Sequence, residues 1–180
     1  GWPELNDTPN RRIKGKFDEL IKIRKFRESI PDWLDKIGLD ELGEKNWEKE
    51  LNALNQKASV IIRTNTLNTT IDKLQAILSD EDIQTEKIKG YPEALKLIIR
   101  KNLFLTDAFK NGLFEIQDAS SQLVAPFLQI EDGMKICDVC AGAGGKTLHL
   151  SALSENKGQI IAMDIYKNKL HELKRRAKRN

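Results

Sequence analysis

Hydrophobic residues recur with a helical period in the first part of the chain and with a shorter, strand-like period after residue 58. In residues 11–29, Ile13, Phe17, Leu20 and Ile21 fall on one face of a helix. The spacing therefore predicts an amphipathic helix that ends before the next proline, where the helical pattern cannot continue.

A second helical stretch is predicted over residues 31–56. This stretch begins at Pro31, is acidic, and carries two of the three tryptophans, Trp33 and Trp47. Large aromatic side chains bury much apolar surface, so we expect both to pack in a core.

The next section has the pattern of a small mixed domain. The predicted elements are a strand at 59–65, a helix capped by Thr69 or Thr70 and ending near Ser79, and strands at 83–88 and 95–100 around Gly90–Pro92. This order suits a split-βαβ domain of ferredoxin or RNA-recognition type. The aromatic stacking pattern of an RNA-recognition motif is missing, so the sequence does not support RNA binding by its sheet face.

The last section reads as the start of a doubly wound α/β sheet. The predicted elements are a short strand or lead-in at 112–117, a helix over 118–128, a strand at 135–140, a helix through Ser151, a strand at 159–164 and a basic helix at 167–179. The predicted fold class is therefore α/β. We expect a helical region over 1–56, a split-βαβ accessory domain over 57–112, and the first part of a Rossmann-like domain over 113–180.

Composition narrows the class of protein. The chain has 180 residues, of which 39% are hydrophobic and 32% are charged. This balance excludes a disordered chain and a collagen-like repeat, and no apolar run approaches the roughly 20 residues that span a bilayer. The N-terminal Gly1–Pro3 has no signal pattern, and two cysteines cannot form a disulfide scaffold, so we expect a cytoplasmic protein with no membrane partner.

Charge is segregated along the chain. Residues 11–27 hold eight basic residues against two acidic ones, and residues 166–179 hold seven against one, although the net charge is only +3. The rest of the chain is therefore acidic. Two basic stripes indicate a polyanion such as RNA as the partner, while the alternative is two solvated helix faces.

Residues 138–147 carry the most chemical information, because a glycine cluster between a strand and a helix lets a ligand approach the backbone. A Walker phosphate loop would need glycine where Cys140 stands, and a dinucleotide fingerprint would need glycine at Thr147. Neither phosphate motif fits. The remaining nucleotide interpretation is an S-adenosylmethionine (SAM) site.

Asp164 lies 22 residues after Gly142, near the ~20 expected for an acid that binds ribose hydroxyls. A carboxylate there would repel the 2′-phosphate of NADP. These features favour a nucleoside cofactor, with SAM ahead of NAD. The alternative is a plain tight turn in which Asp164 caps the next helix.

Cys137 and Cys140 form a C-x-x-C pair. On a strand, residues three apart point to opposite faces, so this pair is poorly placed to share a metal or form a disulfide. We expect both to be small core residues, with Cys140 near the cofactor, and we predict no metal site. His149 is expected to pack or to lie at the surface rather than to act as a general base.

Several segments together resemble the RNA cytosine-5 methyltransferases, the family of the bacterial ribosomal RNA enzyme and its eukaryotic Sun-domain relatives. The segments are Phe114–Gln122, Asp138–Thr147, Ala162–Ile165, and upstream Pro31–Leu34 and Arg63–Leu67. One departure is Gly142-Ala143, where many members have Ala-Pro. The resemblance covers residues 30–180.

The resemblance implies the cofactor SAM and a set of residues that bind it: Cys140, Ala141, Gly142, Ala143, Gly144, Gly145, Lys146 and Asp164. It also implies a covalent mechanism, in which a cysteine thiolate attacks C6 of cytosine, C5 takes the methyl group, and a second cysteine helps release the product. The target base must leave its stack. Both family cysteines lie in motifs beyond the ribose-binding acid, so Cys137 and Cys140 are not candidates.

The resulting hypothesis is a fragment of a SAM-dependent methyltransferase that forms 5-methylcytosine in ribosomal RNA (rRNA), with the catalytic cysteines beyond Asn180 and the fragment alone inactive. Arg63, Arg11 and Arg12 are expected on the RNA side. The alternatives are an NAD-dependent oxidoreductase and a non-catalytic RNA-binding module on the same fold. The sequence does not indicate the oligomeric state, the target RNA or the target cytosine.

Overall fold

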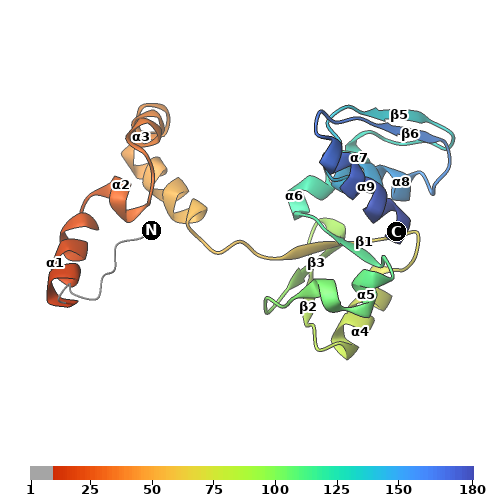
Figure 1. Ribbon diagram of the computed structural model, residues 1–180, viewed down its shortest axis with the longest axis horizontal. Helices are drawn as coiled ribbons and strands as arrows, with labels where there is room; N and C mark the ends of the chain where they lie inside the picture. Colours follow the sequence, from red (N-terminus) through yellow and green to blue (C-terminus); the bar gives the residue numbers. More distant parts are fainter. Residues whose placement is uncertain (1–9) are drawn as a thin grey trace. The chain divides into compact units, whose positions relative to one another are not determined.

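The computed structural model describes residues 10–180, and their side chains from Lys14 onward. The chain divides into two compact units, Gly1–Ala58 and Ser59–Asn180, each of which is described by itself (Figure 1). Within the described residues, no helix has the length and apolar character needed to cross a membrane.

The first unit is helical, with α1 over Asn10–Leu20, α2 over Arg24–Arg27 and α3 over Asp32–Leu54. The prediction of one continuous helix over 11–29 was wrong, because the helix is interrupted before Arg24. The interruption lets Arg24 reach Asp35 at 2.8 Å and Arg27 reach Glu48 at 2.8 Å, both on α3. These ion pairs are tertiary contacts, which the local helical pattern does not predict.

Helix α3 bends at Gly43, which has φ 70° and ψ 161°. The bend brings Trp47 back onto Gly38, where an added Cβ would lie 2.2 Å from the indole ring. Trp47 is buried and its Nε1 donates to Asp35 Oδ1 at 2.8 Å. Trp33 is 64% exposed, so the expectation that both tryptophans pack in a core was wrong for Trp33.

The second unit begins with a four-stranded antiparallel sheet. Its strands are β1 (Ile61–Thr64), β2 (Thr85–Ile88), β3 (Tyr91–Leu97) and β4 (Phe114–Ile116), in the order β2-β3-β1-β4. Helix α4 (Ile71–Asp80), the 3-10 turn η1 (Leu103–Leu105) and the short α5 (Asp107–Lys110) connect them. This is the ferredoxin-like arrangement that the sequence predicts.

One face of this sheet packs against α4 to form the main core of the described residues. The core includes Ile62, Leu74, Leu78, Leu95 and Phe114, all fully buried. Of the two predicted caps, Thr70 is the one that caps α4, by accepting from the backbone N–H of Lys73.

Two details of the sheet differ from the expected elements. Strand β3 covers Tyr91–Leu97 rather than 95–100, because a tight turn with Gly90 at φ 86° pairs Ile88 directly with Tyr91. Strand β4 pairs with β1 through Arg63↔Glu115, so the four-stranded sheet extends past the boundary expected at residue 112.

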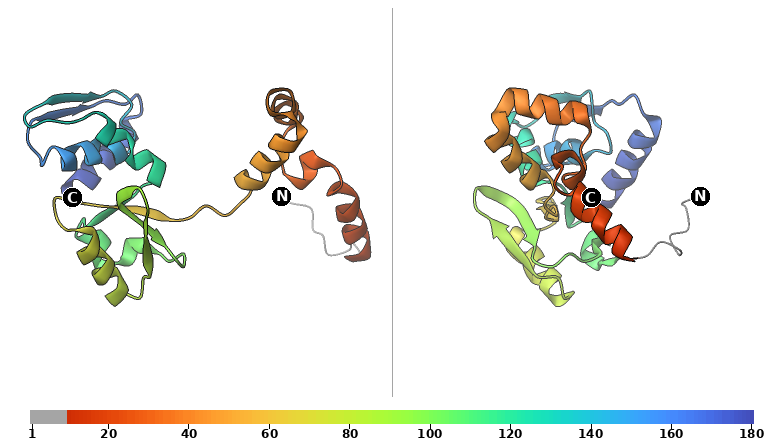
Figure 2. Two further views of the ribbon diagram at one scale, coloured as in Figure 1. Left: turned by 180° about the vertical axis from the view of Figure 1, so that it is seen from behind. Right: turned by 90° about the vertical axis from the view of Figure 1, so that its left-hand side faces the viewer.

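The rest of the unit holds α6 (Ala119–Gln122), α7 (Val124–Phe127), β5 (Lys135–Asp138), α8 (Gly145–Leu153), β6 (Gln159–Ala162) and α9 (Lys167–Arg179). Strands β5 and β6 are parallel, with Asp138 opposite Ala162. Figure 2 shows α7, α8 and α9 on one side of this strand pair, between it and the four-stranded sheet. The predicted start of a Rossmann-like sheet is therefore present.

Candidate cofactor site

The turn between β5 and α8 is shaped by two glycines with positive φ. Gly142 has φ 53° and Gly144 has φ 91°. A Cβ at Gly142 would meet nothing within 4 Å, whereas one at Gly144 would lie 2.6 Å from Leu173 Cγ on α9. Gly142 therefore leaves the backbone open to a ligand, and Gly144 allows α9 to pack against the turn.

Asp164 fastens this turn to the end of β6. Its Oδ2 accepts the N–H of Gly142 at 2.8 Å, and its Oδ1 accepts the N–H of Tyr166 at 2.8 Å. These two backbone hydrogen bonds, from Tyr166 and then Gly142, lower the pKa of the Asp164 carboxyl from its ordinary value. The group is thus held as a carboxylate, and each oxygen keeps further capacity to accept a hydrogen bond.

Asp138 at the end of β5 secures the other side of the turn. Its Oδ2 accepts the hydroxyl of Thr147 at 2.7 Å, and its Oδ1 accepts the N–H of Cys140 at 3.3 Å. A backbone hydrogen bond adds a further connection, because the N–H of Ala141 donates to the carbonyl of Met163 at 2.9 Å. The turn is therefore held at three places by groups at the carboxyl ends of two parallel strands, where α/β sheets bind ligands.

A cleft of about 370 Å³ lies beside the turn between β5 and α8. Its lining residues are Gln117, Asp118, Ser121, Asp138, Cys140, Ala141, Gly142, Gly145 and Lys146. Five of the eight predicted cofactor residues thus face one cleft. Ala143 and Gly144 instead lie toward α9, and Asp164 lies against the turn through its bond to Gly142.

Four of the lining residues were absent from the predicted site. Asp138 and the Gln117–Ser121 segment belong to motifs that carry the family resemblance, but nothing in their spacing indicates that the segment after β4 and the start of α6 meet the glycine turn. The start of α6 is ordered by Asp118, whose Oδ1 accepts the N–H of Ser120 at 2.9 Å. The segment that follows β4, the start of α6 and the turn after β5 therefore all contribute to the cleft.

The expectation that both cysteines are core residues was wrong, because Cys137 and Cys140 are exposed. Cys137 lies on β5 and Cys140 lies in the turn. Within residues 10–180, no three His, Cys, Asp or Glu side chains cluster as a metal site would require. His149 is 1% exposed on α8, with Nε2 3.1 Å from Glu93 Oε2, and thus packs in the interior.

The residues expected on the RNA side divide into two cases. Arg63 is 1% exposed and its Nε donates to Gln117 at 2.9 Å, so the prediction that it faces RNA was wrong. Burial lowers the pKa of its guanidinium, and the charges of Glu93 and Glu115 partly offset this effect. The side chains of Arg11 and Arg12 lie outside the described residues.

The two basic stripes are also partly neutralised within their own units. In the first, Arg24, Lys25 and Arg27 form ion pairs with acidic residues of the same unit. In the second, Arg176 and Arg179 pair with Glu115. The exposed basic residues of α9 are Lys167, Lys169, Lys174, Arg175 and Lys178.

Comparison with known families agrees with this architecture. Residues 30–102 match the ferredoxin-like domain of RsmF/B-like methyltransferases, and residues 125–180 match the 16S rRNA methyltransferase RsmB/F. The chain belongs to the RsmB/F methyltransferase family. The first match covers most of the four-stranded sheet, and the second contains the glycine turn and Asp164.

Individual relatives place the chain within this family. It is 30% identical, over 98% of its length, to ribosomal RNA small subunit methyltransferase B of Serratia proteamaculans and spans 42% of that protein. The solved structure of PH0851 has a TM-score of 0.80 at 28% identity, covering 86% of this chain and 35% of the other. NSun6 from Pyrococcus horikoshii, solved with SFG, has a TM-score of 0.78 at 20% identity, covering 83% of this chain and 62% of the other, and shows the shared fold.

Proposed function

We propose that the chain is part of a SAM-dependent enzyme that forms 5-methylcytosine in small-subunit rRNA. The observation that carries this proposal is the bond between Asp164 and Gly142, because it places a carboxylate under an open glycine turn beside a cleft of about 370 Å³. The rRNA methyltransferase relative supports the substrate class.

The residues around the cleft offer groups that suit the ribose and methionine parts of SAM. Asp164 would accept from the ribose hydroxyls, and the chain from Cys140 to Gly142 would lie along the cofactor. The first N–H groups of α8 have no acceptor within the helix, and they and Lys146 suit the carboxylate of the methionine part. When bound, SAM supplies an electrophilic methyl group.

Neither cysteine of this chain is the proposed nucleophile. Cys137 lies on β5 and does not line the cleft, and Cys140 lies in the turn under the proposed cofactor. The covalent mechanism therefore needs cysteines from outside these 180 residues, and the proposal expects no methyl transfer by the 180 residues alone. The target cytosine must be unstacked to reach them.

We assign RNA contact to the outer face of α9, which the ferredoxin-like sheet supports through Glu115. The exposed lysines of α9 would contact phosphates without reading sequence. The three expected parts remain proposed as a helical region over 1–56, an accessory domain over 57–112 and the first part of the cofactor domain over 113–180. β4 links the second and third parts because it belongs to the sheet of the second.

Calorimetric titration of the full-length protein tests the cofactor assignment. We expect SAM to bind, NAD not to bind, and Asp164→Ala to weaken SAM at least tenfold, about the effect of losing a hydrogen bond to a charged group. A matched control is Asp132→Ala, which removes an exposed carboxylate outside the cleft. Preferential binding of NAD, or unchanged SAM affinity in Asp164→Ala, would refute the assignment.

A further inference from the structure

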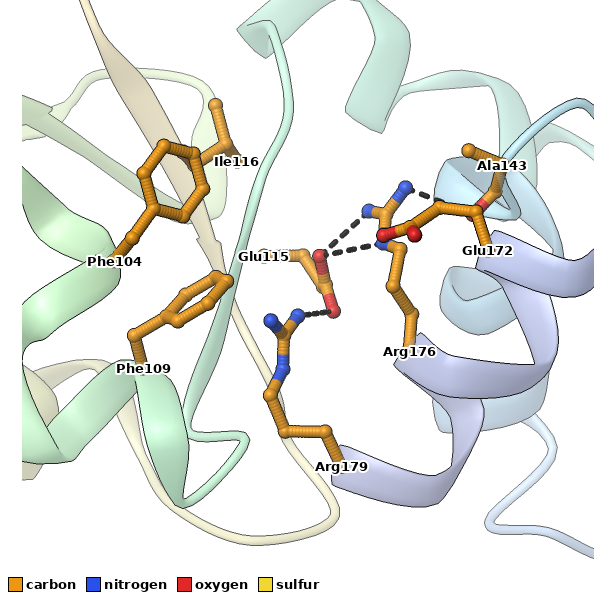
Figure 3. A pocket seen from close by; sticks show the side chains of 8 residues that line it. All are labelled: Phe104, Phe109, Glu115, Ile116, Ala143, Glu172, Arg176 and Arg179. Atoms are coloured by element: carbon orange, nitrogen blue, oxygen red, sulfur yellow. Dashed lines mark hydrogen bonds and ion pairs between the residues drawn. The ribbon is translucent and has the colours of Figure 1, made fainter. Parts of the chain in front are cut away.

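Glu115 on β4 is a buried carboxylate that ties α9 to the four-stranded sheet. Its side chain is 2% exposed. Oε2 accepts from Arg176 through Nη2 at 2.6 Å and Nε at 3.1 Å, and Oε1 accepts from Arg179 (Figure 3). Oε1 also accepts from Asn180 Nδ2 at 2.6 Å. Such a fully bonded buried carboxylate has one stable arrangement.

The guanidinium of Arg176 has a third contact, on the side away from Glu115. Its Nη1 donates to the carbonyl of Ala143 at 2.8 Å, and Ala143 lies in the glycine turn (Figure 3). Because a guanidinium is planar and rigid, fixing Nε and Nη2 on Glu115 also fixes the direction of Nη1. Glu115 thus orients the Nη1 group of Arg176 that bonds to the turn.

A second contact between α9 and the turn supports this connection. Leu173 occupies the space beside Gly144, where an added Cβ would lie 2.6 Å from Leu173 Cγ. Leu173 and Arg176 are three residues apart, so they lie on the same face of α9. Helix α9 therefore contacts the turn in two ways: Leu173 packs beside Gly144, and Arg176 bonds to the carbonyl of Ala143.

We propose that Glu115 and Arg176 are positioning residues for the cofactor turn, through which the ferredoxin-like sheet determines how well the turn binds its ligand. This inference rests on the proposed SAM site. Neither residue lines the cleft, so each acts on the ligand only through Ala143 and its neighbours.

The Arg176→Lys variant separates positioning from simple ion pairing. A lysine keeps the charge beside Glu115, but its single ammonium cannot span from Glu115 to Ala143 as the guanidinium does. Glu115→Gln tests the other end, because the amide keeps the shape and removes the charge. Arg175→Lys is the matched control, since Arg175 is adjacent on α9 and its side chain is 80% exposed.

The experiment measures two quantities in the full-length protein: amide hydrogen exchange of residues 139–146 without ligand, and SAM affinity by calorimetry. We expect Arg176→Lys and Glu115→Gln to speed exchange in the turn and to weaken SAM about tenfold, while Arg175→Lys changes neither. Unchanged exchange in the turn, or exchange that rises equally over the whole protein, would overturn the inference. If the wild type fails to bind SAM, the proposed function fails, and turn exchange still decides the positioning role.

Discussion

The Oδ2 of Asp164 accepts the backbone N–H of Gly142 at 2.8 Å, although the two residues are 22 positions apart. The contact joins the end of β6 to the turn after β5. It means that Asp164 has a structural role in addition to its proposed role toward ribose. Experiments on the site must therefore separate damage to the turn from the removal of a group that binds the ligand.

The bond between Thr147 and Asp138 provides a test of how firmly the turn is held. Thr147→Val keeps the shape of the side chain and removes the hydroxyl that donates to Asp138 at 2.7 Å. We expect the free energy of unfolding to fall by about 1–2 kcal/mol, because the hydrogen bond is to a charged group. Urea denaturation measures this. Thr66→Val, at an exposed position, should cost much less, and equal losses would contradict the assignment.

A side chain at Gly112 would clash with the end of α9. Gly112 has φ 65°, and an added Cβ would lie 2.1 Å from the carbonyl oxygen of Arg179. Gly90 has φ 86° but open space around it, so Gly90→Ala reports the backbone strain alone. We expect Gly90→Ala to cost about 1 kcal/mol and Gly112→Ala at least about 2 kcal/mol more. Similar unfolding free energies for the two variants would show that α9 does not pack there.

The Glu115 carboxyl predicts how stability depends on pH. Burial alone would raise its pKa, but hydrogen bonds from Arg176 and Asn180 and the charges of Arg176 and Arg179 outweigh burial, so the pKa lies below the ordinary value of 4.5. Its contribution to stability is complete above pH 4.5 and is lost as pH falls through the lowered pKa.

We therefore expect Glu115→Gln to be clearly less stable than the wild type at pH 7, with the difference shrinking as pH falls below 4.5. Urea denaturation from about pH 7 to about pH 3 measures this difference. Glu86→Gln, at an exposed ion pair on β2, is the control and should show little dependence. A difference for Glu115→Gln that stays constant over this range would contradict the pKa direction.

The outer face of α9 predicts salt-dependent RNA binding. Lys174 and Lys178 are exposed on α9, and Lys73 and Lys89 are exposed on the ferredoxin-like part. In the full-length protein, we expect Lys174→Gln with Lys178→Gln to reduce the slope of log affinity against log salt by about 0.7 for each phosphate of single-stranded RNA that is no longer neutralised. Lys73→Gln with Lys89→Gln removes the same charge and should leave the slope nearly unchanged. Equal slopes for the two double variants would refute RNA contact by α9.

Much of the fold follows from local sequence signals. Helix α9 covers the predicted residues 167–179, and Asp164 lies against the glycine turn. Both could be predicted because strand ends, glycine positions and an acidic residue at a strand end can be read directly from the sequence. The ferredoxin-like order was predictable from the sequence of elements. Its last strand, β4, was assigned to the next section because its pairing with β1 is not local.

The unpredicted features depend on long-range contacts made by charged residues. Glu115 and Arg176 are 61 residues apart, and neither position carries a local sign of burial. The sequence predicts Arg63 on the RNA side, whereas Arg63 is buried and bonds to Gln117, 54 residues away. A charged residue is paired inside a protein only when the whole fold supplies its partner. The periodicity of hydrophobic residues along the sequence therefore does not predict these roles.

The most direct test of the central claim is a double-mutant cycle between Asp164 and the ribose. S-adenosylhomocysteine and its 2′-deoxyribose analogue are titrated calorimetrically into the full-length wild type and Asp164→Ala. If Asp164 accepts from the ribose hydroxyl, removing the hydroxyl weakens binding to the wild type about tenfold or more and to Asp164→Ala only slightly. If removing the hydroxyl costs the same in both proteins, Asp164 supports only the turn, and the claim that it binds the cofactor is contradicted.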